Sequence, residues 1–137
     1  MIDAGLMLQA MNLYIDAKKL YNSAIDIDNY SSAEASLRYD IVNLLLGEYV
    51  KTLKRMNQLR YITFLESSYY SEYYSALAVA NYMTGNIDEA IKKKQFVSSY
   101  EEEIIKILKE NRFWNDYMIN IYLSIPENIL TYNDIII

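Results

Sequence analysis

A ladder of tyrosines is the feature of this sequence with the clearest capacity for recognition or chemistry. The chain has 15 Tyr among 137 residues, and four of them are Tyr69, Tyr70, Tyr73 and Tyr74. Residues four apart lie on the same face of a helix, so Tyr69 and Tyr73 share one face and Tyr70 and Tyr74 share the next. Tyr is enriched at protein interfaces because it buries a large ring and keeps a polar hydroxyl. The ladder therefore predicts either a core face with solvated hydroxyls or a partner surface or dimer seam, and a catalytic tyrosine is the third alternative.

A basic cluster is the second candidate, and its chemistry would be contact with phosphate groups. It consists of Lys51, Lys54, Arg55 and Arg60, near the predicted end of a helix. Cations at a helix C-terminus also interact favourably with the helix dipole, which gives the cluster a structural interpretation. The three lysines at 92–94 follow two acidic residues at a predicted helix start, and we interpret them in the same structural way.

Two absent residue types exclude several kinds of active site. The chain has no Cys and no His, which removes thiolate nucleophiles, disulfides, cysteine zinc sites and triads that contain His. The acidic run Glu101–Glu103 suits only a hard cation such as Mg or Ca, and it lacks the ligand spacing of a calcium loop. We therefore expect no metal, no cofactor and no enzymatic activity. An enzyme that uses carboxylates or Tyr with a bound metal is the least supported alternative.

Length and composition indicate one intracellular helical domain. The 13 Lys and Arg are outnumbered by 18 Asp and Glu, and a net charge of -5 disfavours bulk affinity for nucleic acid without excluding a local basic patch. Only 3 Gly and 1 Pro are too few turn formers for an all-β domain of this length. The absence of an 18-residue apolar run and of a signal-peptide pattern predicts a cytoplasmic protein with no membrane partner. The bias toward Ile, Tyr, Asn and Lys is typical of AT-rich genomes, such as those of some archaea and viruses.

Hydrophobic periodicity predicts an all-α fold of five to six helices in antiparallel hairpins, as a helical bundle or a short two-repeat array. In the first helix the apolar stripe includes Met11 and Ile15. Gly47 falls inside the second helix, either as a tolerated glycine or as a point of close packing. The helices are expected at residues 4–27, 32–56, 64–84, 87–97, 101–111 and 113–123, and the segment 101–111 either follows a kink or starts a new helix.

Start and stop signals set these bounds. The patterns Ser31–Glu34 and Thr63–Glu66 are typical of capping boxes, in which two side chains bond the first backbone N–H groups of a helix. Gly85 is expected to end the third helix, and Asn86 to cap the fourth.

The end of the sequence is apolar. We assign residues 1–126 to one all-α domain and 127–137 to a tail that includes Ile135, Ile136 and Ile137. Three isoleucines exposed to water would be unusual, so the tail is expected to pack on the body or on a second protomer. These isoleucines join the Tyr ladder as candidate interface residues.

Two stretches between predicted helices share the pattern x-Asn-apolar-x-x-Ala, at 28–33 and at 85–90. The small Ala lets two antiparallel helices approach closely, and the apolar residue fills the corner of the turn. The similarity predicts two helical hairpins that are arranged alike.

Residues 69–97 resemble a tetratricopeptide-type hairpin. Such repeats carry a small residue on the first helix, a Gly at the turn and Ala on the second helix, and here Ala78, Gly85 and Ala90 stand at the matching positions. The last Ala of the family pattern is replaced by Val97, and the closing Pro is absent. The resemblance implies binding of a peptide or protein, not catalysis.

The tyrosine-rich helix at 69–78 also resembles the Tyr-Tyr-Ala helix of HEPN domains, which are helical bundles. Catalytic members of that family use an Arg followed within a few residues by His. Because this chain has no His, the resemblance implies a related fold without that RNase chemistry.

Together these features predict a small non-enzymatic interaction protein that self-associates as a homo-oligomer or binds a protein partner. The alternative is an accessory or regulatory factor that contacts nucleic acid through the local basic cluster.

Overall fold

Helices make up all the regular structure in the part of the chain that is described, which confirms the predicted all-α class. The computed structural model describes residues 2–27, 32–97, 101–110 and 113–128. Two short 3₁₀ turns, η1 (Tyr61–Phe64) and η2 (Ser67–Tyr69), lie between the fourth and fifth α-helices. The α-helices are α1 (Ile2–Ala10), α2 (Tyr14–Ile27), α3 (Ser32–Leu45), α4 (Tyr49–Leu59), α5 (Tyr70–Met83), α6 (Ile87–Gln95), α7 (Glu101–Glu110) and α8 (Asp116–Ser124).

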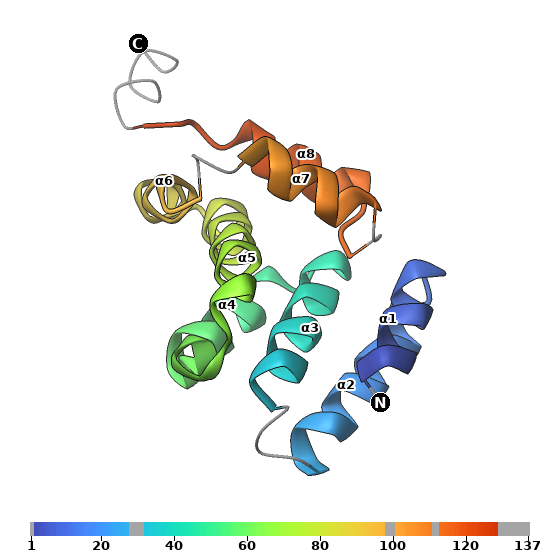
Figure 1. Ribbon diagram of the computed structural model, residues 1–137. Helices are drawn as coiled ribbons and strands as arrows, with labels where there is room; N and C mark the ends of the chain where they lie inside the picture. Colours follow the sequence, from blue (N-terminus) through green and yellow to red (C-terminus); the bar gives the residue numbers. More distant parts are fainter. Residues whose placement is uncertain (1, 28–31, 98–100, 111–112, 129–137) are drawn as a thin grey trace.

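Successive hairpins stack beside one another along the chain (Figure 1). Within the hairpins α1 packs on α2, α3 on α4 and α5 on α6. Between them α2 packs on α3, α4 packs on α5, and α3 also contacts α5. The last helix, α8, packs on α5 and covers that end of the array. No described helix is long and apolar enough to cross a membrane.

Three hairpin turns in the described part of the chain close with one backbone conformation. Asn12, Gly47 and Gly85 have φ angles of 62°, 84° and 86°, in the left-handed region. In each turn the N–H after this residue donates to the carbonyl five residues earlier, a Schellman motif that satisfies the last carbonyls of the helix. The bonds run from Leu13 to Leu8, from Glu48 to Asn43 and from Asn86 to Asn81, at 2.8, 2.9 and 2.9 Å.

A small buried side chain follows each turn at the same interval. Ala17, Thr52 and Ala90 each lie five residues after the left-handed residue, and they are 0%, 2% and 0% exposed. The described residues therefore contain this kind of hairpin three times. The predicted counterpart of 85–90, at 28–33, lies partly outside the described residues, and the counterparts that the structure shows are the turns at Asn12 and Gly47.

Two of the predicted long helices are each a pair of helices. The segment 4–27 breaks between Ala10 and Tyr14, and the segment 32–56 breaks between Leu45 and Tyr49. Both interpretations of Gly47 are therefore wrong. The residue lies in a turn, and a Cβ atom there would meet no atom within 4 Å, so Gly47 is needed for its positive φ and not for close packing.

Three capping predictions have different outcomes. Thr63 lies in η1 and Glu66 precedes η2, neither forms a side-chain cap, and α5 starts only at Tyr70. Asn86 does occupy the position before α6, but its side-chain amide donates to the Thr84 hydroxyl at 3.2 Å and makes no cap bond. The pattern Ser31–Glu34 includes a residue outside the described ranges.

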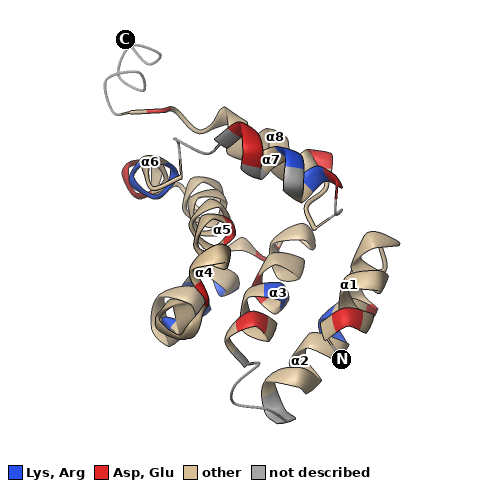
Figure 2. Cartoon of the chain, viewed as in Figure 1, with Lys and Arg blue, Asp and Glu red and all other residues tan. Residues whose placement is uncertain are grey.

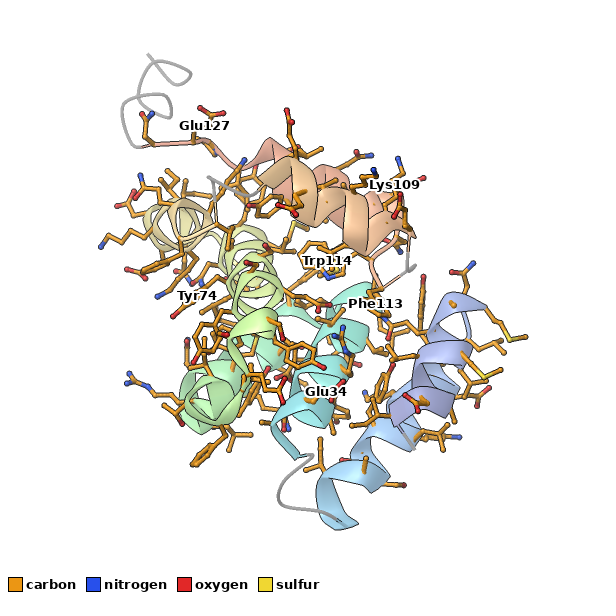
Figure 3. The ribbon with its side chains drawn as sticks, viewed as in Figure 1. Glu34, Tyr74, Lys109, Phe113, Trp114 and Glu127 are labelled. Atoms are coloured by element: carbon orange, nitrogen blue, oxygen red, sulfur yellow. The ribbon has the colours of Figure 1, made fainter. Side chains whose placement is uncertain are left out.

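The main core lies where α3, α4, α5, α6 and α8 meet. Trp114, which is 2% exposed, points into the interior between α5 and the α7–α8 segment (Figure 3). Its ring meets Tyr122 edge to face at a centroid distance of 6.3 Å. A second, smaller cluster of Ala17, Tyr21 and Val42 joins α2 to α3. The first hairpin is thus attached to the body mainly through one side of α2.

The turn geometry predicts the sign of a substitution at Gly47. Gly47→Ala should lower the free energy of unfolding by about 1 to 2 kcal/mol, because Ala is strained in the left-handed region. If Gly47 lay inside a helix, the same change would raise stability by about 1 kcal/mol. Urea denaturation measures the difference, and Asn12→Gly, which keeps a left-handed turn without strain, is the matched control and should be neutral or stabilising.

Candidate functional site

A groove lies between α2 and the segment from α3 to the α3–α4 turn. It has a volume of about 460 Å³. A second hollow of about 320 Å³ continues it, since both share Ile15 and Leu46. We call the first hollow the Tyr39 groove, and its lining residues are Ile15, Lys18, Lys19, Asn22, Tyr39, Leu46 and Glu48.

Cations surround the aromatic ring of this groove. The Lys18 ammonium lies over the ring of Tyr39, 5.8 Å from its centroid, and the Arg55 guanidinium lies 4.9 Å from the same centroid. Glu48 offsets part of this charge, because its carboxylate is 3.9 Å from Lys18. Lys19 is exposed at the edge. The groove therefore offers apolar contacts beside positive charge, a combination that suits an apolar segment carrying an acidic residue.

Exposed apolar side chains continue from the groove along the first hairpin. Met7, Met11, Leu13 and Ile15 are 67%, 63%, 42% and 61% exposed. They belong to the end of α1, the turn at Asn12 and the start of α2. Leu13 and Ile15 line the two hollows, and Met7 and Met11 lie earlier on the same hairpin. A group of exposed large apolar side chains on one hairpin is typical of an interaction site, whereas scattered ones are ordinary. We call this set the α1–α2 apolar surface.

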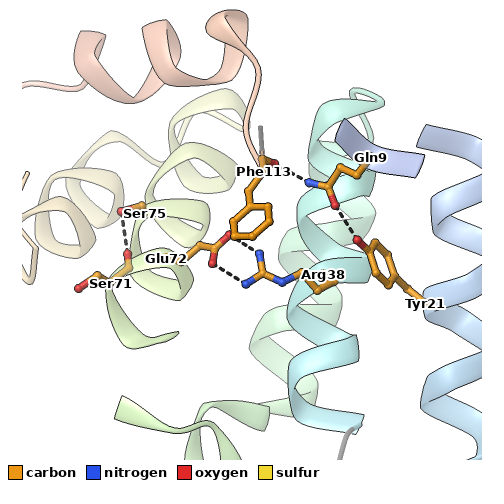
Figure 4. A network of polar contacts seen from close by, with 7 residues as sticks. All are labelled: Gln9, Tyr21, Arg38, Ser71, Glu72, Ser75 and Phe113. Atoms are coloured by element: carbon orange, nitrogen blue, oxygen red, sulfur yellow. Dashed lines mark hydrogen bonds and ion pairs between the residues drawn. The ribbon is translucent and has the colours of Figure 1, made fainter. Parts of the chain in front are cut away.

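A buried polar network connects α1, α2, α3, α5 and the segment before α8 (Figure 4). Arg38 on α3 donates to both carboxylate oxygens of Glu72 on α5, at 2.5 and 2.9 Å. Gln9 on α1 donates to the Phe113 carbonyl at 2.5 Å and accepts from the Tyr21 hydroxyl at 2.8 Å. The ring of Phe113 also lies 4.5 Å from the Arg38 guanidinium, so Phe113 contacts both the Gln9 amide and the Arg38–Glu72 pair.

Charge and burial shift the pKa values of this network. Burial alone lowers the pKa of Arg38, but the Glu72 carboxylate raises it, and the net shift is upward, so Arg38 is a permanent cation. Burial raises the pKa of Tyr21 above its ordinary value, although Arg38 opposes the shift. Both shifts favour the protonated form, so neither group changes its charge near neutral pH, which suits a structural role.

Asp40 on α3 is a buried carboxylate with a pKa shifted toward neutral. It is fully buried, and its Oδ2 accepts from Arg55 at 2.7 Å and from the Tyr61 hydroxyl at 2.5 Å. Burial raises its pKa to about 6, against the lowering effects of Arg55 and of the Tyr61 hydrogen bond. Burial and the Asp40 charge in turn raise the pKa of Tyr61 well above its usual value.

The structure divides the predicted Tyr ladder. Tyr73 is only 4% exposed and belongs to the core, which corrects its assignment to a partner surface. Its ring meets Tyr61 and Tyr74 edge to face, with centroids 5.5 and 5.3 Å apart. Tyr69 and Tyr74 are half-buried, and Tyr70 is 40% exposed. Ile135, Ile136 and Ile137 lie outside the described residues.

The predicted basic cluster is not a single surface. Arg55 is half-buried in its ion pair with Asp40, while Lys51 in the first turn of α4 and Lys54 in its middle are exposed. Arg60 ends α4 in the left-handed conformation. Lys51, Lys54 and Arg55 precede the last turn of α4, so the helix-dipole interpretation is wrong for these three, whereas Arg60 does lie at the C-terminal end of the helix. Several helices, among them α3, α6 and α7, carry both basic and acidic residues (Figure 2).

The lysines at 92–94 do lie in the last turn of α6, as the helix-dipole interpretation requires. Lys92 and Lys93 contact Glu89 at 3.4 and 3.9 Å. Lys94 differs from them, because it is 3% exposed and its ammonium donates to the carbonyls of Ile125 and Tyr122 at 2.7 and 3.3 Å. It therefore holds the end of α8 against α6.

Sequence reasoning missed the groove. Ile15 and Met11 were assigned to a buried helical stripe, but they are exposed because the chain turns at Asn12. Tyr39, Lys18 and Lys19 carried no pattern that separates them from ordinary surface residues. The available signal was Asn12 itself, since Asn is the residue other than Gly that most readily takes the left-handed conformation.

Comparison of the chain with protein-family models, curated proteins and solved structures found no match. Among the described residues, no group of three or more Asp or Glu side chains could hold a metal ion.

The Arg38–Glu72 pair predicts a large cost for removing one partner. Glu72→Gln should lower the free energy of unfolding by about 3 to 5 kcal/mol, because it leaves a buried guanidinium without its counter-charge. The double variant Arg38→Met with Glu72→Leu should recover most of this loss. Chemical denaturation of both variants measures the effect, and a cost below about 1 kcal/mol for Glu72→Gln would show that water reaches the pair.

Asp40 predicts a pH dependence of stability. Its pKa is raised from 3.8 to about 6 by burial, so the native protein binds a proton more tightly than the unfolded chain. Stability from this group is fully present below pH 4 and is lost as the pH rises through 6, by up to about 3 kcal/mol. Asp40→Asn should remove this dependence. Parallel stability curves for the two proteins between pH 4 and 7 would contradict the shift.

Proposed function

We propose that this protein is a non-enzymatic interaction module that self-associates through the Tyr39 groove and the adjoining α1–α2 apolar surface. The observation that carries the proposal is the exposure of Leu13 and Ile15, which line the groove and its continuation, together with that of Met7 and Met11 on the same hairpin. Exposed apolar area costs about 25 cal/mol per Å², so a binding partner that covers these side chains gains free energy.

The hairpin repeat gives the surface its context. In arrays of stacked hairpins each unit buries its apolar faces against its neighbours, and an end unit needs a polar outer face or a cap. Here α8 covers α5 at one end, with Met118 and Tyr122 buried. The first hairpin has no such cover in the described part of the chain. A second protein molecule would supply it.

The alternative role, contact with nucleic acid, draws less support. Its strongest residue, Arg55, is engaged with Asp40, and the exposed Lys51 and Lys54 stand on a chain with a net charge of -5. Counterion release from phosphates needs several clustered cations.

Light scattering during size exclusion tests the proposal. The wild-type protein should show a mass above that of the monomer that rises with concentration. Ile15→Glu places a charge on the apolar surface and should weaken association at least tenfold. Leu59→Glu is the control, since Leu59 is 55% exposed in the last turn of α4 and should have no effect.

Either of two results would overturn self-association through this surface. One is a wild-type protein that stays monomeric at every concentration, and the other is an Ile15→Glu variant that associates normally. An excess of absorbance at 260 nm that is lost on adding salt would favour the nucleic-acid alternative.

A further inference from the structure

We propose that residues 129–137 of one copy of this chain bind in the Tyr39 groove of a second copy. This inference rests on the proposed function and names the occupant of the same surface. It follows from three observations: the chemistry of the groove, the composition of this segment, and the place where the described chain ends.

The groove and the segment have complementary chemistry. The segment Ile-Leu-Thr-Tyr-Asn-Asp-Ile-Ile-Ile carries one acid, Asp134, and no Lys or Arg. The groove presents the apolar side chains of Ile15 and Leu46 beside Lys18 and Lys19. Glu48 already contacts Lys18 at 3.9 Å, which leaves Lys19 as the cation at the edge for an incoming carboxylate. Apolar contacts would supply most of the affinity, and the charges would fix the orientation.

The place where the described chain ends favours binding between copies. The Gln95 side chain on α6 donates to the Glu127 carbonyl at 3.5 Å, so the chain leaves the body beside α6. In Figure 1 this point lies at the opposite end of the molecule from α2. Between them the packing order is α6 on α5, α5 on α3 and α3 on α2.

The segment 129–137 is also too short to reach the groove of its own molecule and fill it. Neighbouring helices are about 8 to 10 Å apart, so three such steps span about 25 to 30 Å in a straight line. Nine residues reach at most about 30 Å when fully extended. A segment that crossed its own molecule would have no residues left to fill the groove. A second copy can present its groove directly to the segment.

This contact joins unlike surfaces, since the donor uses residues 129–137 and the acceptor uses the groove beside α2. Such heterologous contacts propagate into open chains or close into a ring, whereas a two-fold dimer uses one surface twice. The assembly should therefore show a series of sizes, or one ring, instead of a simple monomer–dimer equilibrium.

Truncation and peptide binding test the occupant. A chain that ends at Asn128 should be monomeric and should keep the thermal stability of the dilute full-length protein. A labelled peptide of residues 127–137 should bind this truncated protein, and Ile15→Glu should weaken the binding at least tenfold. Asp134→Lys in the peptide should weaken it a few-fold, and Lys19→Glu in the protein should restore it.

Mixing two full-fold variants gives the sharpest result. The truncated chain keeps an intact groove and has no segment, while full-length Ile15→Glu keeps the segment and has an altered groove. Neither should associate alone, but an equimolar mixture should give a 1:1 complex and nothing larger. Full-length Ile136→Glu, which preserves chain length, should behave like the truncated chain.

The contradicting results separate this inference from the proposed function. If Ile15→Glu abolishes association while truncation leaves it intact, the surface is an interface and its occupant is not this segment. If the full-length chain is monomeric and the truncated chain binds the peptide, the segment fills the groove of its own molecule. If truncation unfolds the protein, the segment belongs to the core of its own chain. Each of these results overturns the proposed exchange between copies.

Discussion

The buried ion pair between Arg38 and Glu72 is the interaction on which the arrangement of the hairpins depends. Arg38 is 2% exposed and Glu72 is 7% exposed, so both charges have left water at a cost of several kcal/mol each. Only a pair with close geometry offsets that cost, and the two bonds at 2.5 and 2.9 Å supply it. Because these bonds tolerate little sliding of α3 along α5, we infer that the pair selects one packing of the second hairpin on the third.

The position of Arg38 on α3 also determines what its neighbours do. Successive residues of an α-helix point about 100° apart, so Arg38, Tyr39 and Asp40 face three directions. Arg38 meets α5, Tyr39 lines the groove beside α2, and Asp40 meets Arg55 on α4. Arg55 then lies over the Tyr39 ring, which links the buried Asp40 to the groove. The ion pairs that position α3 against α5 and α4 therefore also position Tyr39 in the groove.

How far the sequence could predict this structure depends on the range of the interactions involved. Helical periodicity and the turn at Gly85 are local, and the all-α class and that turn follow from them. The break at Asn12 was missed because Met11 and Ile15 keep the spacing of a continuous helix. Arg38 and Glu72 are 34 residues apart, and each looks like an ordinary surface charge on its own helix. In the sequence Lys94 also looks like a surface charge. It is buried because its ammonium donates to the Ile125 carbonyl, 31 residues later.

The two ends of the hairpin array differ in a way that bears on assembly. At one end the link to α8 places Trp114 and Tyr122 over α5 and α6, and Lys94 binds the last carbonyls of α8. At the other end the first hairpin presents Met7, Met11 and Ile15 to water. Only one end of this array gains by burial, so two such ends could cover each other in a two-fold dimer. If residues 129–137 of another copy cover the apolar end instead, the contact joins unlike surfaces and leaves one copy uncovered, unless the assembly closes into a ring.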